Sequence, residues 1–306
     1  MKLIITGDMH LDGSKTPVCR TDNYYQTQVN KLQFIQTQMK KYNAIHIDGG
    51  DVLDRATGSG SADSLKSIKL LLDNLGEMYG VLGNHTMKFK NPKFIDESLI
   101  SVLITTGQFK YIDHPIELDD NVVLFGFEFG SPITHIPEKY WDDKYFNIAV
   151  YHGFVDEKPN PLIEGLVASD IVNEFCDDYN LIITADHHKP FVHVDHDCTL
   201  INTGSLMRTT INQIDYEPCI WLIDTVENSI KKIKVPIIKD VISTEHKDKT
   251  EHKQLTMDSV IDVINGTKKG AIDYEGEIAN LIKENKKIMN DEIKVFIEKA
   301  LEEDKA

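Results

Sequence analysis

One kind of junction occurs three times along the first part of the chain, and this repetition constrains the fold more than any other feature. Each time, a short apolar run of the β type ends at a glycine that is followed by acidic, amide or imidazole side chains. The three junctions are Gly7-Asp8-Met9-His10, Gly50-Asp51 and Gly83-Asn84-His85. Stretches with apolar residues three and four positions apart, at about 23–42 and 61–75, separate them and predict helices. This order predicts a βαβαβ unit whose polar side chains share one edge of a parallel sheet.

Asp51 is the expected centre of the site. It follows an apolar run that begins at Ile45, at the carboxyl end of the predicted strand, where open α/β sheets bind their ligands. A carboxylate has two oxygens whose lone pairs point in different directions, so Asp51 is well placed to bridge two metal ions. Asp8 and His10 are two residues apart, and in extended backbone such residues point the same way and reach one ion.

Two later strands carry histidines to the same edge. An apolar run at 146–150 leads into Tyr151-His152-Gly153, and a run at 181–184 leads into Ala185-Asp186-His187-His188. The alternation of extended backbone puts Asp186 and His188 on one face and turns His187 away. Between and after these motifs we expect a helix at 92–106, a strand at 121–129, and strands at 198–205, 219–224 and 229–236 that form a meander in a second sheet.

Composition limits the classes of protein that this chain can belong to. The formal net charge of −16 argues against a protein that holds nucleic acid mainly through its own basic surface. No stretch approaches 18 consecutive apolar residues, and Met1-Lys2 leads straight into an apolar strand and not into a signal peptide, so we expect no membrane span and a cytoplasmic location. Four scattered cysteines without CxxC spacing fit reduced thiols and not a zinc knuckle.

The ordered motifs around Asp8, Asp51, Asn84, His152 and Asp186 resemble those of the calcineurin-like metallophosphoesterase superfamily. The resemblance covers about the first two hundred residues and implies a four-layer α/β/β/α sandwich. Within this superfamily, the segment from Asn202 to Arg208 and the two strands that follow it are most similar to the SbcD-type DNA repair exonucleases.

The resemblance implies a ligand set and a catalytic group. One metal ion would be held by Asp8, His10, Asp51 and His188, and the second by Asp51, Asn84, His152 and Asp186. His85 would protonate the leaving oxygen, Asp54 would supply a carboxylate that orients His85, and Arg55 is a candidate phosphate contact. The mixture of imidazole and carboxylate suits two divalent ions, with Mn²⁺ favoured over Mg²⁺, Fe²⁺ or Zn²⁺.

The chain departs from the family pattern at its last metal motif. The family has Gly-His-x-His there, whereas this chain has Ala185 in place of the glycine and Asp186 in place of the first histidine. An aspartate still binds a metal, but it adds negative charge and a harder oxygen, which changes the expected metal preference.

The expected organisation is a phosphoesterase domain at 1–240, a charged linker at 241–255 and a helical C-terminal segment at 256–306. The last segment carries an apolar stripe at helical spacing, formed by Ile278, Leu281, Ile282, Ile288, Ile293, Phe296, Ile297 and Leu301. A stripe of this kind must be buried, either on the chain's own core, in a homodimer, or on a partner. The resemblance implies docking onto the coiled-coil base of an SbcC-type ATPase.

These features together favour a DNA exonuclease or endonuclease of recombination and repair that depends on two metal ions. One alternative keeps the chemistry and changes the substrate to a phosphomonoester or a cyclic nucleotide. A second alternative is a weakly active interaction subunit, because the altered Asp186 motif departs from the family pattern.

Overall fold

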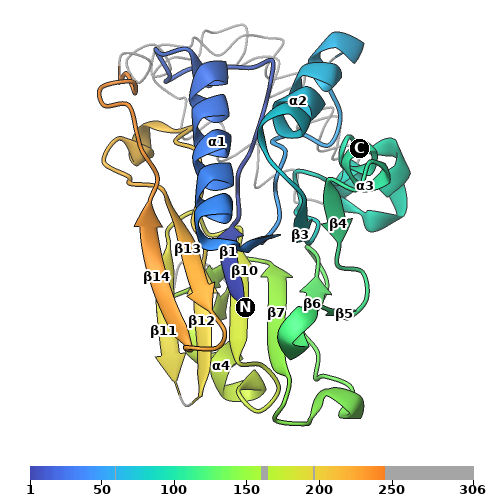
Figure 1. Cartoon of the computed structure of the whole chain (residues 1–306). Coiled ribbons are helices and arrows are strands. Elements are labelled where there is room, and N and C mark those ends of the chain that lie inside the picture. Colours follow the sequence, from blue (N-terminus) through green and yellow to red (C-terminus); the bar gives the residue numbers. More distant parts are fainter. Residues whose placement is uncertain (59, 160–164, 196, 245–306) are drawn as a thin grey trace, which may run out of the picture. The chain divides into compact units, whose positions relative to one another are not determined.

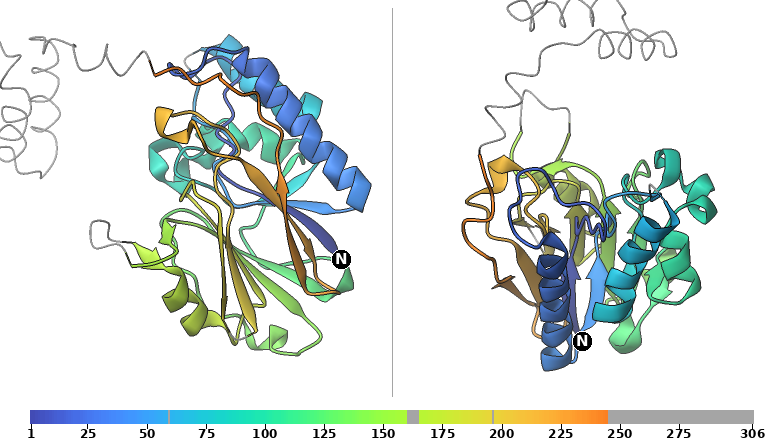
Figure 2. Two further views of the ribbon diagram at one scale, coloured as in Figure 1. Left: turned by 90° about the vertical axis from the view of Figure 1, so that its left-hand side faces the viewer. Right: turned by 90° about the horizontal axis from the view of Figure 1, so that it is seen from above.

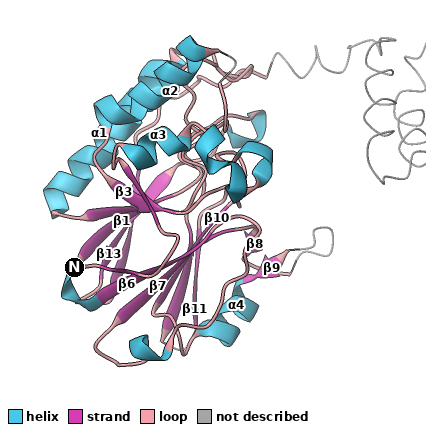
Figure 3. Cartoon of the chain, turned by 90° about the vertical axis from the view of Figure 1, so that its right-hand side faces the viewer, coloured by secondary structure: helices cyan, strands magenta, loops and turns pink. Residues whose placement is uncertain are grey.

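Two β-sheets packed face to face, with helices on both outer sides, form the α/β/β/α sandwich that the sequence predicts (Figure 1). The computed structural model describes residues 1–244, apart from 59, 160–164 and 196. Figure 3 shows helices α1 to α3 on one side of the paired sheets and helix α4 on the other. Within the described residues, no helix combines the length and apolar character that crossing a membrane requires.

The first sheet contains the three strands of the predicted βαβαβ unit. Its strands, in spatial order, are β14 (Ser229–Lys234), β13 (Cys219–Asp224), β1 (Lys2–Thr6), β2 (Ile45–Asp48), β3 (Met78–Gly80) and β4 (Phe109–Tyr111). Strands β1 to β4 are parallel, and β13 pairs antiparallel with β1. Because β1, β2 and β3 run the same way, the loops that follow them meet at one edge.

The second sheet brings the later histidine motifs to the same region. Its spatial order is β11 (Phe191–Asp195), β12 (Cys198–Asn202), β10 (Leu181–Ala185), β7 (Phe146–His152), β6 (Val122–Phe127) and β5 (Ile116–Glu117). Strands β6, β7, β10 and β12 are parallel, while β5 and β11 run antiparallel at the two edges. A separate pair, β8 (Val155–Asp156) and β9 (Leu166–Val167), follows β7.

Strand β1 shows why its sequence is apolar throughout. Leu3 and Ile5 lie in the core between the two sheets, whereas Ile4 packs into the core beneath the helices of the first sheet. Both faces of the strand are therefore buried, and a strand in this position reads as a continuous apolar run. A third core lies between the second sheet and α4 (Ala168–Phe175).

Helices α1 and α2 lie where the sequence predicts them. Helix α1 (Tyr24–Tyr42) begins after Asn23, whose side chain accepts a hydrogen bond from the Gln26 amide at 3.1 Å, a cap worth about 1 kcal/mol. Helix α2 (Ser61–Asn74) lies beside α1 on the outer face of the first sheet (Figure 2). Short 3₁₀ turns occur at η1 (Lys88–Lys90), η2 (Pro92–Glu97), η3 (Asp119–Asn121), η4 (Glu138–Tyr140) and η5 (Ile211–Gln213).

Two predictions about elements were wrong. The helix expected at 92–106 is divided into η2 and α3 (Ile100–Thr105), with Ser98 in extended backbone between them. The three last strands do not form a meander in one sheet: β12 pairs with β10 in the second sheet, while β13 and β14 extend the first sheet beyond β1. Connection length alone does not reveal which sheet edge a strand joins.

The segment expected as a linker begins with packed residues. Val241 and Ile242 are buried with Cys19, and the Ser243 amide donates to the Cys19 carbonyl at 2.8 Å. The rest of the expected linker from 245, and the helical C-terminal segment at 256–306, lie outside the described residues.

Candidate metal centre

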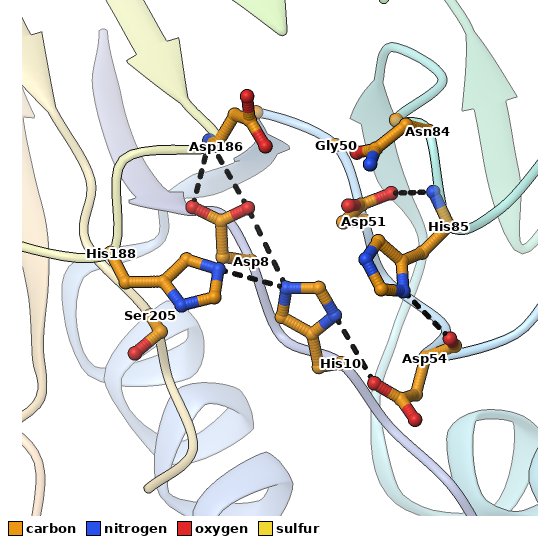
Figure 4. A network of polar contacts seen from close by, with 12 residues as sticks. Asp8, His10, Gly50, Asp51, Asp54, Asn84, His85, Asp186, His188 and Ser205 are labelled. Carbon is orange, nitrogen blue, oxygen red and sulfur yellow. Dashed lines mark hydrogen bonds and ion pairs between the residues drawn. The ribbon is translucent and has the colours of Figure 1, made fainter. Parts of the chain in front are cut away.

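The polar side chains that follow β1, β2, β3 and β10 converge at one edge of the sandwich (Figure 4). His152, the last residue of β7, lies with Asp8 and Asp51 in the same place. Asp8, Asp51 and His152 are almost completely buried, and His10 is 6% exposed. Asp8, His10 and Asp51 have left-handed backbone, with φ of 46°, 45° and 54°. Non-glycine residues adopt this conformation at a cost, and such residues cluster at functional sites.

This backbone corrects one argument made from the sequence. The sequence predicts extended backbone at Asp8 and His10, yet β1 ends at Thr6 and both residues lie in a loop. Their proximity survives, because His10 Nε2 is 3.9 Å from Asp8 Oδ1. The tight left-handed turn brings the two side chains together where alternation along a strand does not.

Two imidazoles converge in the first group of candidate ligands. The Nε2 atoms of His10 and His188 are 3.1 Å apart, and Asp8 completes a group whose ligand atoms all lie within 4.8 Å of one another. The Asp54 carboxylate lies 3.4 Å from His10 Nδ1, on the other side of the ring. His10 Nδ1 makes no hydrogen bond within the described residues, but the charge of this carboxylate favours a proton on Nδ1 and leaves Nε2 as the metal-binding atom.

His152 is oriented in the same way in a second group, with Asp8 and Asp51. Its Nδ1 donates to the Gly49 carbonyl at 2.8 Å, so its Nε2 faces Asp51 Oδ2 at 3.5 Å and Asn84 Oδ1 at 3.3 Å. Asp51 Oδ2 is buried and has no hydrogen-bond partner among the described residues. Asp8 and Asp51 each belong to two of the three groups of candidate ligands, whereas the resemblance gave the shared role to Asp51 alone.

His85 lies at the exposed side of the same centre. Its backbone amide donates to Asp51 Oδ1 at 2.8 Å, and its ring meets the ring of His10 edge-on at 4.7 Å. Its Nδ1 contacts the Asp54 carbonyl oxygen at 2.9 Å. A carbonyl oxygen only accepts, so Nδ1 is the donor and Nε2 is the atom left to exchange a proton with a substrate.

Asp54 and Arg55 make contacts different from those expected. The contact between Asp54 and His85 uses the backbone carbonyl, while the Asp54 carboxylate faces His10. Arg55 pairs with the buried Asp12 carboxylate at 2.7 Å and bonds Ser14 Oγ at 2.9 Å. Arg55 would therefore have to leave the Asp12 carboxylate, at least in part, before it could bind a phosphate in the way we expected.

Asp186 contributes its backbone to the centre. Its amide donates to both Asp8 carboxylate oxygens, at 2.9 and 3.1 Å, from left-handed backbone with φ of 85°. Its carboxylate belongs to none of the three ligand groups found among the described residues, and Figure 4 shows it pointing away from His188. His187 is turned away as expected, with Nε2 3.4 Å from Asp156 Oδ1 and its ring beside Phe154.

Burial and the neighbouring charges shift the pKa values of the groups in the centre. Burial raises the pKa of Asp8 to about 6, against the opposing effect of His152 and His10. Burial favours the neutral form of His152, but its contact with Asp51 and the charge of Asp8 outweigh this and raise its pKa to about 9. Burial, with the nearby charge of His10, lowers the pKa of His188 to about 4. The centre thus combines closely spaced carboxylates and imidazoles at a mostly buried position.

The sequence did not reveal the backbone contacts that the segment at 205–206 makes with two of the candidate ligands. The Leu206 amide donates to the Asp8 carbonyl, and the Ser205 amide to the His188 carbonyl, both at 3.2 Å. Lys31, which is 4% exposed, donates to the Leu206 carbonyl. The signal was present, because Lys31 stands four residues before Ile35 and therefore on the apolar face of its helix.

The model of the calcineurin-like phosphoesterase family matches residues 1–190, well over half of the chain. The chain belongs to this family. No curated protein matches its sequence. Solved structures with similar folds include a Thermus thermophilus protein (12% identity, 77% of this chain and 99% of that one, TM-score 0.48) and an archaeal phosphodiesterase (13%, 76% and 99%, 0.41). Another is a 5'-nucleotidase precursor, also from Thermus thermophilus (11%, 82% and 57%, 0.42).

The donor set of this calcineurin-like phosphoesterase fits divalent metal ions. Two buried carboxylates and four imidazoles, including that of His85, converge. The Nδ1 atom of His152 is hydrogen-bonded to a backbone carbonyl, and that of His10 faces the Asp54 carboxylate at 3.4 Å. The buried Asp51 Oδ2 without a hydrogen-bond partner among the described residues is an atom that an ion would satisfy. Asp8, His10 and His188 would hold one ion, and Asp8, Asp51 and His152, with Asn84 beside them, would hold the other.

Metal affinity is expected to rise with pH. An ion binds neutral imidazole, so below about pH 9 it must displace the proton of His152, and below about pH 6 also that of Asp8. Between these values we expect the binding constant for Mn²⁺ to rise about tenfold per pH unit for each proton displaced. Calorimetric titrations in buffers with different ionisation heats measure both the binding constant for Mn²⁺ and the number of protons released. Equal affinity at pH values of about 6.5 and 8.5, with no proton release, would contradict this assignment.

The ligand role of Asp186 stays a prediction. Asp186→Ala removes the carboxylate and keeps the amide that holds Asp8, so it should weaken one metal site selectively if the carboxylate binds an ion. His187→Ala is the matched control and should leave metal binding unchanged, because His187 pairs with Asp156 outside the centre. Metal titrations of both variants measure the difference, and the opposite ranking would shift the motif by one residue.

Proposed function

We propose that this calcineurin-like phosphoesterase hydrolyses phosphodiester bonds in DNA, as an exonuclease or endonuclease, with two divalent ions of which Mn²⁺ is favoured. The ions would supply positive charge that holds the phosphate and activates the attacking water. His85 would give its Nε2 proton to the leaving oxygen. An alkoxide released from DNA is a poor leaving group, so this proton matters.

The contact between Arg55 and Asp12 carries the choice of a diester over a monoester. A terminal phosphate bears up to two negative charges, and arginine forks are well suited to binding it in two-pronged fashion. Here Arg55, which follows Asp54 in the sequence, directs its guanidinium to Asp12 Oδ2 at 2.7 Å and Oδ1 at 3.0 Å. Without that arginine the centre is better matched to the single charge of a diester.

The substrate class is tested by comparing five substrates in the presence of Mn²⁺. These are labelled single-stranded DNA, labelled double-stranded DNA, bis(p-nitrophenyl) phosphate, p-nitrophenyl phosphate and a cyclic nucleotide. The proposal expects hydrolysis of DNA and of the generic diester, and much slower hydrolysis of the monoester. Preference for the monoester or the cyclic nucleotide would replace the nuclease assignment, and inactivity on all five would favour an interaction subunit.

The partner remains a proposal based on the sequence. An acidic nuclease gains DNA affinity by acting with a basic partner, and the apolar stripe at 278–301 is suited to docking on the coiled-coil base of an SbcC-type ATPase. Truncation should follow Thr244 and not Val241, because Val241 and Ile242 are part of the packed core.

The truncated chain is expected to hydrolyse bis(p-nitrophenyl) phosphate at the full rate and to lose copurification with the ATPase. Its metal centre lies wholly within the residues that remain. Affinity capture and diester turnover measure the two effects. Normal binding of the ATPase by the truncated chain would exclude the segment as the docking element, and a change from dimer to monomer would assign the stripe to homodimer formation.

A further inference from the structure

A short basic and aromatic segment follows His85 and has no role in the site described above. Phe89, within η1, exposes 72% of its surface. Phe89 and Lys90 both have left-handed backbone, with φ of 57° and 52°. For a bulky residue this conformation is a genuine outlier, and it persists only where the surrounding structure enforces it. The turn holds an apolar ring in solvent at the expense of backbone strain.

Two neighbouring side chains contact the Phe89 ring. The edge of the Phe94 ring meets it at 5.2 Å between ring centres, and the Lys88 ammonium group lies 5.1 Å from its centre. Lys88 is in turn paired with Glu97. These contacts orient the ring, and its large exposed area leaves room for another flat group to stack on it.

The segment lies beside the metal centre. The Lys90 ammonium group is 5.9 Å above the ring of Phe129, and that ring lies 6.4 Å from the ring of His152. A hydrogen bond of 2.9 Å from the Phe129 amide to the Leu82 carbonyl ties Phe129 to the strand end that leads to Asn84. One aromatic ring therefore separates Lys90 from a candidate metal ligand.

The local charge is opposite to that of the whole chain. Lys88, Lys90 and Lys93 occur within six residues, in a chain of formal net charge −16. Among the described residues, Lys88 has an ion-pair partner, whereas no carboxylate pairs with Lys90 or Lys93. An exposed aromatic ring flanked by lysines is the combination with which proteins bind single-stranded nucleic acid, by stacking on the base and contacting the phosphates.

We propose that Phe89 stacks on an unpaired nucleobase next to the scissile phosphodiester, and that Lys90 and Lys93 contact the flanking phosphates. This inference rests on the proposed function and narrows its substrate to DNA that is single-stranded or frayed at the point of cleavage. A base in a duplex is stacked on its neighbours, so only an unpaired base can use the Phe89 ring.

The inference is tested by measuring the binding of two oligomers to the full-length chain. Divalent ions are left out so that the oligomers are not hydrolysed. One is a single-stranded oligothymidylate, and the other is an abasic phosphodiester strand of equal length. Phe89→Ala should weaken binding of the oligothymidylate by about 5- to 150-fold, the usual worth of one stacked base, and should abolish most of the preference for it over the abasic strand. In the Phe89→Trp variant, the oligothymidylate should quench the fluorescence of the introduced indole more than the abasic strand does.

Three further variants separate stacking from other effects. Lys90→Ala and Lys93→Ala should weaken the binding of both oligomers to the same extent. They should also reduce the salt dependence of binding, because they remove phosphate contacts. Trp141→Ala is the matched control, since Trp141, directly after η4, is 63% exposed, and its loss should change neither affinity. Phe89→Gly should melt at the same or a higher temperature and still lose the preference for bases, which excludes unfolding as the cause.

Equal affinity of the wild-type chain for the two oligomers, or a preference that survives Phe89→Ala, would overturn the inference. Turnover of bis(p-nitrophenyl) phosphate with Mn²⁺ then shows whether the proposed function fails as well. A wild-type chain that hydrolyses this diester without preferring base-bearing strands contradicts the stacking role alone. A chain that hydrolyses no diester contradicts the proposed function itself.

Discussion

His85→Ala is expected to lower turnover of a phosphodiester by about 10²–10⁴-fold, the usual worth of a positioned proton donor. The Asp54 carbonyl oxygen fixes Nδ1 of His85 at 2.9 Å, which leaves Nε2 as the atom that transfers the proton. We expect the bound metal to remain, because three other side chains are available for each ion. Steady-state kinetics on bis(p-nitrophenyl) phosphate and elemental analysis of the purified variant measure the two effects.

The competing outcome for His85 is a role as a ligand. One of the three ligand groups contains His85 together with His10 and Asp51. Loss of a metal ion from His85→Ala would therefore reassign it from acid to ligand. His114→Ala serves as the matched control, since its imidazole is exposed and pairs with Asp113, and neither metal content nor turnover should change.

Gly50→Ala is expected to destabilise the protein and to disable the second metal group. A Cβ atom there would lie 2.3 Å from His152 Nδ1, and the backbone φ of 111° is one that side chains rarely adopt. Backbone strain and overpacking together cost roughly 2–6 kcal/mol. Displacing His152 also removes an imidazole from the group formed with Asp8 and Asp51. Chemical denaturation and metal titration measure these losses.

Gly107→Ala separates the two causes. Gly107 has a similar positive φ of 76°, but nothing lies within 4 Å of the place where its Cβ would be. The free energy of unfolding of this variant should fall only by the cost of left-handed backbone, about 1–2 kcal/mol, and metal binding should be normal. If Gly50→Ala bound metal as well as Gly107→Ala does, the position of His152 against the Gly50 turn would not be required for the centre.

The fold was predictable where local pattern and tertiary structure agree. Strands such as β1 are apolar on both faces, so their burial in the middle of a sheet follows from the sequence. The pairing of β13 with β1 was not predictable, because spacing along the chain does not show which of the two sheets offers an edge to a late strand. The break at Ser98 between η2 and α3 was missed because apolar spacing continues across it.

The site was predictable in its membership more than in its geometry. Residue type and position at strand ends brought Asp8, His10, Asp51, His85, His152 and His188 to one place. The contacts within the site depend on left-handed loop backbone, as at Asp186, where the amide and not the carboxylate reaches Asp8. The partner of Arg55 was missed because Asp12 lies in a different loop, and spacing along the chain does not reveal such a contact.

We propose that Asp8 and Asp51 organise a two-ion centre that hydrolyses phosphodiesters. The most direct measurement is the initial rate of bis(p-nitrophenyl) phosphate hydrolysis as Mn²⁺ is added stepwise to metal-free protein of known concentration. We expect no activity without metal, and a rate that rises with the second equivalent and levels off at two ions per chain. Full activity at one ion per chain, or activity in the metal-free protein, would contradict it.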